Sequence, residues 1–180
     1  CDNLITELLD FSRSRDLMLQ PVFIDQWLKQ LIAEESIPSD INIIQEFYSN
    51  AEISIDCELF RRALINIIDN ACQSFSDMPD GMASNKNITL KTRNDDHDLV
   101  ISILDTGPGI PGQNLEYIFE PLYSTKGFGI GLGLTIVKRI VNQHNGNIVI
   151  SSCENQGTLV EIHLPKCSEI TNSISREIVN

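Results

Sequence analysis

The sequence contains little positive charge and few aromatic residues. Its formal net charge is −12, from 25 acidic and 13 basic residues, and 6% of the 180 residues are aromatic. The basic residues are scattered along the chain, and an acidic chain of this kind is repelled by nucleic acids and by anionic membrane surfaces. We therefore expect neither a nucleic acid nor a membrane surface as a direct partner.

Cysteines and long apolar runs are also scarce. The five cysteines are Cys1, Cys57, Cys72, Cys153 and Cys167, and no two of them form a C-x-x-C pair. This odd number favours reduced, mostly buried thiols in a cytosolic protein. No apolar run approaches the ~18 residues of a membrane helix. There is no signal peptide, and the first residue is not methionine, so we interpret the chain as a fragment of a longer protein.

The sequence does contain a regular succession of helical and strand-like patterns. Helices are predicted at 3–15, 26–35, 57–75 and 132–144, where apolar residues recur at the helical period. Strands are predicted at 41–48, 53–55, 88–93, 98–104, 147–151 and 158–164. Asp25 and Asp56 are predicted N-caps of the helices that follow them, and Pro21 is predicted to interrupt the chain after the first helix.

This order of elements predicts the fold class. A polar loop at 77–87 and a glycine-rich segment at 105–133 separate the helices and strands. Several consecutive strands are close enough to form hairpins, which does not favour a doubly wound parallel sheet. We predict an α/β (α+β) two-layer sandwich, in which about three helices pack on one face of a mixed, mostly antiparallel sheet.

Two asparagines in the predicted helix 57–75 form the first candidate site. Asn66 and Asn70 are four residues apart and therefore share a helical face. Asparagine is a poor residue for a helix interior, whereas its amide oxygen can bind a hard cation such as Mg²⁺. The alternative is that both are solvated polar residues on an amphipathic helix.

The segment Asp105-Thr106-Gly107-Pro108-Gly109-Ile110 follows a predicted apolar strand directly. A carboxylate at a strand end can accept a hydrogen bond from an exocyclic amine. Gly107 and Gly109 allow the backbone to turn sharply and to approach a flat base. The same residues also fit an ordinary turn.

Two further segments combine glycine with a possible phosphate ligand. Lys126 ends an aromatic-rich run that begins at Phe119, and it can serve as a phosphate-binding charge or as an exposed loop lysine. Gly129, Gly131 and Gly133 lead into the predicted helix 132–144, where backbone N–H groups favour an anion. Their spacing matches neither the Walker loop nor the Rossmann fingerprint.

Taken together, the four segments resemble the N, G1, F and G2 boxes of the histidine kinase catalytic domain. That domain has the Bergerat ATP-binding fold, shared with the gyrase B subunit, MutL-type repair proteins and a chaperone ATPase. The resemblance covers about residues 25–165, and Gly157–Pro165 is similar to the family's last strand. The short stretch from Phe119 to Gly129 is most similar to sensor kinases of the nitrogen-regulation type, which have a short ATP lid.

The resemblance implies ATP and Mg²⁺ as cofactors and a set of site residues. Asn70 would bind the metal, Asn66 and Lys126 would act in catalysis near the phosphates, and Asp105 would read the adenine amino group. Further nucleotide-binding residues implied by position are Gly107, Gly109, Ile110, Gly129, Gly131, Gly133, Leu134 and Thr158. Hydrolytic relatives carry a glutamate where Asn66 stands, and a neutral amide cannot serve as a general base.

The resemblance further implies a division of the chain and a set of partners. Residues 1–20 would comprise the end of the second helix of a dimerisation and phosphoacceptor domain and a linker, 21–166 would form the catalytic domain, and 167–180 a polar, disordered tail. The chain would phosphorylate a histidine that it lacks, for relay to a response-regulator receiver domain. The full-length protein would be a cytoplasmic homodimer, with or without an inner-membrane anchor. The alternatives are a gyrase- or MutL-type ATPase and a degenerate, binding-only kinase module.

Overall fold

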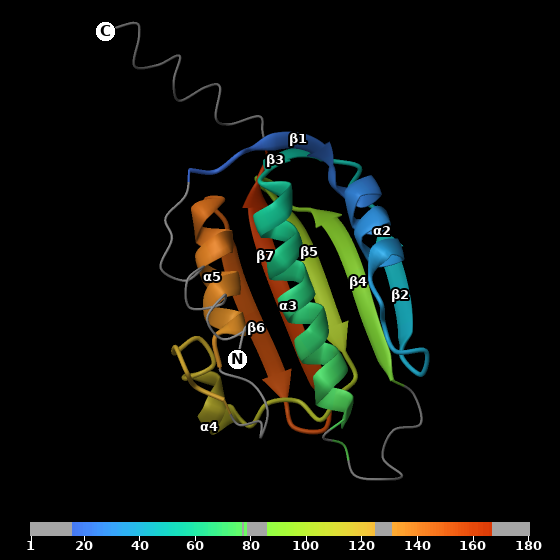
Figure 1. The fold of residues 1–180 in the computed structure, drawn as a ribbon, viewed down its shortest axis with the longest axis vertical. Helices are drawn as coiled ribbons and strands as arrows, with labels where there is room; N and C mark the ends of the chain where they lie inside the picture. The colour runs from blue at the N-terminus through green and yellow to red at the C-terminus, as the bar shows by residue number, and fades with distance from the viewer. Residues whose placement is uncertain (1–15, 77, 79–85, 125–130, 167–180) are drawn as a thin grey trace, which may run out of the picture.

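The main sheet crosses the whole molecule (Figure 1). The computed structural model describes residues 16–76, 78, 86–124 and 131–166. Within them the strand order is β2-β4-β5-β7-β6. The strands are β2 (Asn42–Phe47), β4 (Asn87–Asn94), β5 (Asp98–Asp105), β6 (Asn147–Cys153) and β7 (Gly157–Pro165). Only β2 and β4 pair in parallel among these neighbours, so the predicted mixed, mostly antiparallel sheet is confirmed.

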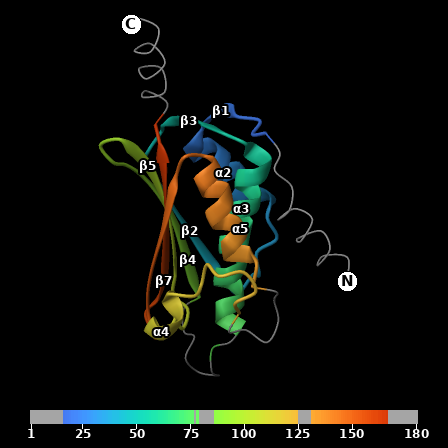
Figure 2. The ribbon, with the colours of Figure 1, turned by 90° about the vertical axis from the view of Figure 1, so that its left-hand side faces the viewer.

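Three helices cover one face of this sheet. They are α2 (Ile24–Glu34), α3 (Cys57–Ser76) and α5 (Gly133–Gln143). In Figure 2 the sheet is seen nearly edge-on, with these helices on one side of it. The predicted two-layer sandwich is therefore confirmed, and the helices and sheet enclose a single apolar layer between them.

The apolar face of α3 supplies the centre of that layer. Its apolar residues Phe60, Leu64, Ile67, Ile68 and Ala71 are all at most 4% exposed. They face a sheet surface whose inward side chains, such as Ile101 and Ile103, are also buried. Removing one large side chain from such a layer costs about 2–5 kcal/mol of unfolding free energy, so this face holds α3 in place.

A second, two-stranded sheet lies at one end of the molecule and was not predicted. It pairs β1 (Gln20–Phe23) with β3 (Glu52–Ile55) in antiparallel register. Pro21 was interpreted only as a break, but an edge strand tolerates proline because one side of it needs no ladder N–H. The two predicted strands around Ser49-Asn50 do form, yet they join different sheets.

Asp25 is not the N-cap that the sequence predicts. Helix α2 begins at Ile24, the residue before Asp25, so Asp25 lies inside the helix, where it is 4% exposed. Its carboxylate accepts hydrogen bonds from the Asn50 N–H at 2.9 Å and from the Thr92 hydroxyl at 2.7 Å. Asp25 thus ties α2 to β4 and to the turn before β3, a tertiary role that local sequence cannot reveal.

The second predicted N-cap, Asp56, is confirmed, and the structure adds one short helix. The Asp56 carboxylate accepts the Leu59 N–H at 3.1 Å, so Asp56 caps α3 as predicted. The glycine-rich segment contains a short unpredicted helix, α4 (Gly112–Leu115). In the part of the chain that the structure describes, no helix is long and apolar enough to span a membrane. The predicted helix 3–15 and the predicted tail 167–180 lie outside that part.

Candidate nucleotide-binding site

A polar stripe on α3 lies against two parts of the glycine-rich segment 105–133. Asn66, Asn70 and Ser74 follow one another at intervals of four residues and so share one helical face. A β-carbon added to Gly133 would lie 3.8 Å from Asn66 Oδ1 and 3.8 Å from Asn70 Nδ2. A β-carbon added to Gly107 would lie 2.3 Å from Ser74 Oγ. The stripe therefore joins the start of α5 to the loop after β5.

The sheet contributes a polar row next to this stripe. Asp105, Thr158 and Ser152 are cross-strand partners on β5, β7 and β6. One step back toward the core, the partners Ile103, Val160 and Ile150 are apolar. Because side chains alternate along a strand, both rows face the helices. The inner face of the sheet thus changes from apolar to polar where the strands meet the glycine loops.

Asp105 is held in place by the loop that follows it. Its side chain is buried, and its Oδ1 accepts the Gly107 N–H at 2.8 Å. Gly107 must lack a side chain, because an added β-carbon would also come within 2.8 Å of that same oxygen. The result is a carboxylate fixed at the end of β5 and facing the space between sheet and helices.

Two other glycines let this loop approach the β6–β7 turn. Gly109 has φ +72° and Gly157 has φ +92°, and an added β-carbon would meet the Cys153 carbonyl at 2.1 Å and the Asp105 carbonyl at 1.9 Å, respectively. The Asn155 N–H donates to the Pro108 carbonyl at 2.7 Å. The Ile110 N–H donates to Ser152 Oγ at 2.8 Å. Backbone therefore packs directly on backbone on this side of the site.

The N-terminus of α5 points at the stripe. Its N-cap residue, Leu132, is buried and makes no side-chain capping bond. Gly131 has φ +72°, and its carbonyl accepts the Leu122 N–H at 3.1 Å. Leu134, half-buried in the first turn, follows Gly133. The backbone N–H groups of a helix start favour an anion, and the glycine keeps side chains away from them.

The segment before α5 is pinned to that helix by aromatic contacts. The Phe119 carbonyl accepts the Thr135 hydroxyl at 3.1 Å, and Lys138 Nζ lies 4.7 Å from the Phe119 ring centroid. The rings of Tyr117 and Tyr123 are 5.6 Å apart. The two Phe119 contacts hold the start of the predicted lid close to α5.

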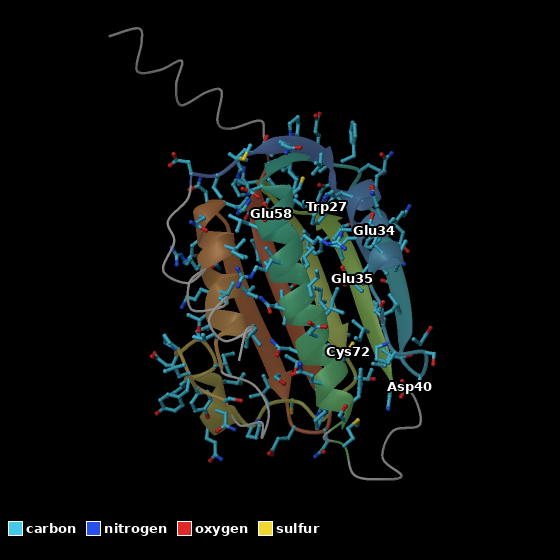
Figure 3. The ribbon with its side chains drawn as sticks, in the orientation of Figure 1. Trp27, Glu34, Glu35, Asp40, Glu58 and Cys72 are labelled. Atoms are coloured by element: carbon cyan, nitrogen blue, oxygen red, sulfur yellow. The ribbon has the colours of Figure 1, made fainter. Side chains whose placement is uncertain are left out.

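The described part of the chain offers amide and hydroxyl oxygens at this site rather than a cluster of classical metal ligands. No group of three or more His, Cys, Asp and Glu is close enough to hold a metal there. Burial raises the pKa of the Cys72 thiol on α3 (Figure 3), and the charges of Asp69 and Asp40 raise it further. Cys72 therefore stays protonated at neutral pH and is a poor nucleophile.

The structure brings most of the predicted site residues together. Asn66, Asn70 and Gly133 meet between α3 and α5, while Asp105 and Thr158 lie side by side on the sheet. Gly107, Gly109, Ile110, Gly131 and Leu134 line the connecting loops and the start of α5. Lys126 and Gly129 lie outside the described residues.

Sequence reasoning missed two residues of this site. Ser74 continues the four-residue spacing of Asn66 and Asn70, so that spacing could have revealed it. Ser152 becomes visible only through its register opposite Thr158, which a single sequence does not give.

Comparison with known proteins agrees with this geometry. The chain belongs to the family described as histidine kinase-, DNA gyrase B-, and HSP90-like ATPases, which matches residues 55–168. Its relatives within that family include bacterial sensor kinases. Sporulation kinase E of Bacillus subtilis is 31% identical over 175 residues, and the histidine-protein kinase AtoS of Escherichia coli is 31% identical over 169 residues. The resemblance to bacterial sensor histidine kinases is thereby confirmed.

The alignments cover 91% of this chain but only 22% and 27% of those two relatives, so the chain spans about a quarter of their length. Among solved structures, full-length ShkA in complex with AMPPNP has a TM-score of 0.78 at 26% identity, covering 91% of this chain and 35% of that one. The histidine kinase ThkA in complex with the response regulator TrrA has a TM-score of 0.71 at 23% identity, covering 93% and 48%. The second similarity shows the fold alone.

Proposed function

We propose that this chain is the ATP-binding catalytic domain of a two-component sensor histidine kinase. It transfers the γ-phosphate of ATP to a histidine of a phosphoacceptor domain, and the phosphate then passes to a response-regulator receiver domain. The observation that carries the proposal is the contact of the Asn66–Asn70–Ser74 stripe with both the start of α5 and the Asp105 loop. That contact supports the proposal because it brings together amides that would bind a metal, a helix start that would bind an anion and a carboxylate that would read the base.

The donor set at this place fits Mg²⁺. The metal prefers oxygen ligands and keeps several waters while it binds phosphate oxygens. The Asn70 amide oxygen would be its protein ligand, with Asn66 one turn away beside the phosphates. Bound Mg²⁺ would neutralise charge on the transferred phosphoryl group.

The remaining residues would bind the nucleotide. Asp105 accepts a hydrogen bond from the adenine amino group, and Thr158 beside it contacts the same edge directly or through water. The N–H groups at the start of α5 bind phosphate oxygens, and Lys126 adds a positive charge from the lid. Catalysis then comes mainly from positioning and from charge neutralisation.

Asn66 distinguishes a kinase from a hydrolase. An ATPase of the gyrase type needs a carboxylate to activate water, and a neutral amide cannot do so at pH 7. A binding-only module is disfavoured because Asp105, Gly107 and Gly133 are all present in contact with their neighbours.

The whole protein would extend beyond this chain. Residues 1–20 would comprise the end of a phosphoacceptor helix and a linker, 21–166 would be the catalytic unit, and the complete kinase would be a homodimer. A response regulator is the expected partner because this chain is similar to signal transduction histidine kinases such as AtoS. The short segment from Phe119 to Gly129 favours the nitrogen-regulation type of kinase.

Calorimetry with ADP and with ATP tests the binding part of this proposal. We expect both nucleotides to bind more tightly with Mg²⁺ than with a chelator. Incubation with γ-labelled ATP tests the second part, because no histidine here resembles an acceptor. His97 lies in the turn between β4 and β5, His144 is 7% exposed and His163 lies in β7. Base-stable, acid-labile label retained on this chain would contradict it.

A further inference from the structure

Ser152 occupies the outer position of the polar row Asp105–Thr158–Ser152, and all of its hydrogen-bonding capacity is used. Its Oγ accepts the Ile110 N–H at 2.8 Å. The same oxygen lies 2.8 Å from the Gly157 carbonyl and 2.9 Å from Thr158 Oγ1. A hydroxyl has one proton to donate and two lone pairs to accept with, so these three contacts fill it completely.

The direction of each bond follows from the chemistry of the partners. The Ile110 N–H can only donate, and the Gly157 carbonyl can only accept. The single Ser152 proton must therefore go to Gly157. The remaining short contact, to Thr158 Oγ1, then requires that Thr158 donates its own proton to Ser152. No other arrangement makes all three contacts hydrogen bonds.

This assignment fixes what Thr158 can offer to a ligand. With its proton committed to Ser152, its hydroxyl presents only lone pairs to the neighbouring space. The next member of the row, Asp105, is a carboxylate, which accepts hydrogen bonds when ionised. Two acceptors then stand side by side on paired strands, and a single ligand group that meets both of them must carry two N–H bonds, as an exocyclic amine does.

We propose that Ser152 is a specificity-determining residue, which acts through Thr158 to make the site select a 6-amino purine over a 6-oxo purine. This inference rests on the proposed nucleotide-binding function. Adenine carries an exocyclic amine, a donor, where guanine carries an oxo group, an acceptor. Guanine would bring an acceptor toward Thr158, whose only proton is already held by Ser152.

Removing the Ser152 hydroxyl releases that proton. In Ser152→Ala the Thr158 hydroxyl can rotate and donate to an oxo group. We expect ADP affinity to fall and GDP affinity to fall less or to rise. The ADP-to-GDP affinity ratio should drop roughly tenfold, which is the size of one hydrogen bond. Ser152→Thr retains the hydroxyl and should restore most of the ratio.

Ser152 also anchors the loop at Ile110, and this second role must be separated from the first. A loosened loop would weaken ADP and GDP alike and leave their ratio unchanged. The double variant Ser152→Ala/Thr158→Val provides the distinction, because residues that act as one unit show non-additive effects. Once the Thr158 hydroxyl is gone, the Ser152 substitution should no longer move the ratio.

The experiment is calorimetric titration of the parent and the variants with ADP and with GDP in the presence of Mg²⁺. Ser151→Ala is the matched control, since Ser151 is exposed and adjacent in sequence. Ser152→Cys, a weaker hydrogen-bonding group of similar size, replaces the alanine variant if that variant unfolds. An ADP-to-GDP affinity ratio that is lowered in Ser152→Ala but not in Ser151→Ala supports the inference. Equal losses for both nucleotides overturn it while leaving the proposed function intact, whereas a parent chain that binds neither nucleotide overturns both.

Discussion

The two ends of the α3–α5 pair differ in how their polar groups are used. The helices run antiparallel, so the start of α3 meets the end of α5 near the small β1–β3 sheet, and their other ends meet at the candidate site (Figure 1). At the end near the small sheet, side chains satisfy the helix termini. At the site end, Gly133 opens the start of α5 and faces amide side chains.

Asp56 and His144 satisfy the helix termini at the end near the small sheet. The Asp56 N–H donates to His144 Nε2 at 2.9 Å, so the ring proton resides on Nδ1, which donates to the Ile140 carbonyl at 2.8 Å. The Asp56 carboxylate accepts the Leu59 and Met18 N–H groups. This end uses its polar groups internally for stability, whereas the site end directs them toward a ligand. Stability and binding should therefore respond to different substitutions.

The largest expected effect is at Gly157. Substitution by alanine would put a β-carbon 1.9 Å from the Asp105 carbonyl at φ +92°, a conformation that costs an alanine of order 1–3 kcal/mol before the clash is counted. We expect Gly157→Ala to lose nucleotide binding and to unfold at clearly lower denaturant concentration. Gly112→Ala is the control, because nothing lies within 4 Å of its added β-carbon. Equal stability of the two variants would refute the close approach.

Asp105→Asn should separate binding from stability at the site end. The amide oxygen can still accept the Gly107 N–H, so the fold should survive. Without the charge the hydrogen bond to an amino group weakens by about half, and ADP affinity should fall by about 1–3 kcal/mol, more than GDP affinity. Calorimetry beside thermal melts provides the measurement. An unchanged ADP affinity would remove Asp105 from the site.

Asp56→Ala should lower stability without changing nucleotide binding, which is the reverse of the effect expected for Asp105→Asn. Loss of the N-cap costs roughly 0.5–2 kcal/mol of unfolding free energy, while ADP affinity of the folded protein should not change. Asp56→Asn retains a capping oxygen and should fall between the parent and Asp56→Ala in denaturant unfolding. A large drop in affinity for either variant would show that the two ends are coupled.

The smallest effect concerns Asp69, which lies on α3 between Asn66 and Asn70. Burial raises the pKa of its carboxyl above the ordinary value of 3.8, and the charge of Glu35 at the end of α2 (Figure 3) raises it further. The folded state then binds this proton more tightly than the unfolded chain, so stability is lost as pH rises through the raised pKa.

Asp69→Asn removes that penalty. Denaturant unfolding across pH should show the variant slightly more stable than the parent at pH 7, with the difference vanishing as pH falls below the ordinary aspartate range. A variant that is less stable than the parent at pH 7 would mean that the carboxylate has a favourable partner instead.

Local patterns in the sequence predicted much of the fold and named most of the residues that the structure brings together at the candidate site. The helical period of Phe60, Leu64 and Ile67 and the cap at Asp56 depend on residues close in sequence, and both predictions hold. The strand β1 and the buried Asp25 depend on partners about 25 or more residues away. Ser152 likewise gains its role from register across two strands. Each of these features was missed because it depends on pairing between distant residues, which cannot be read from a single sequence.

The most direct test of the central claim is transfer of γ-labelled phosphate from ATP to the protein's own phosphoacceptor domain, supplied as a separate chain. The parent should label the acceptor histidine in a Mg²⁺-dependent reaction. Asn70→Ala should abolish labelling while its thermal melt stays near that of the parent. Ile67→Ala, which removes a side chain only 2% exposed, should lose about 2–5 kcal/mol of stability while its folded fraction still transfers phosphate. Asn70 would instead be a structural residue if Asn70→Ala melts far below the parent while its folded fraction transfers phosphate at the parent's rate, and this result would contradict the metal-binding role.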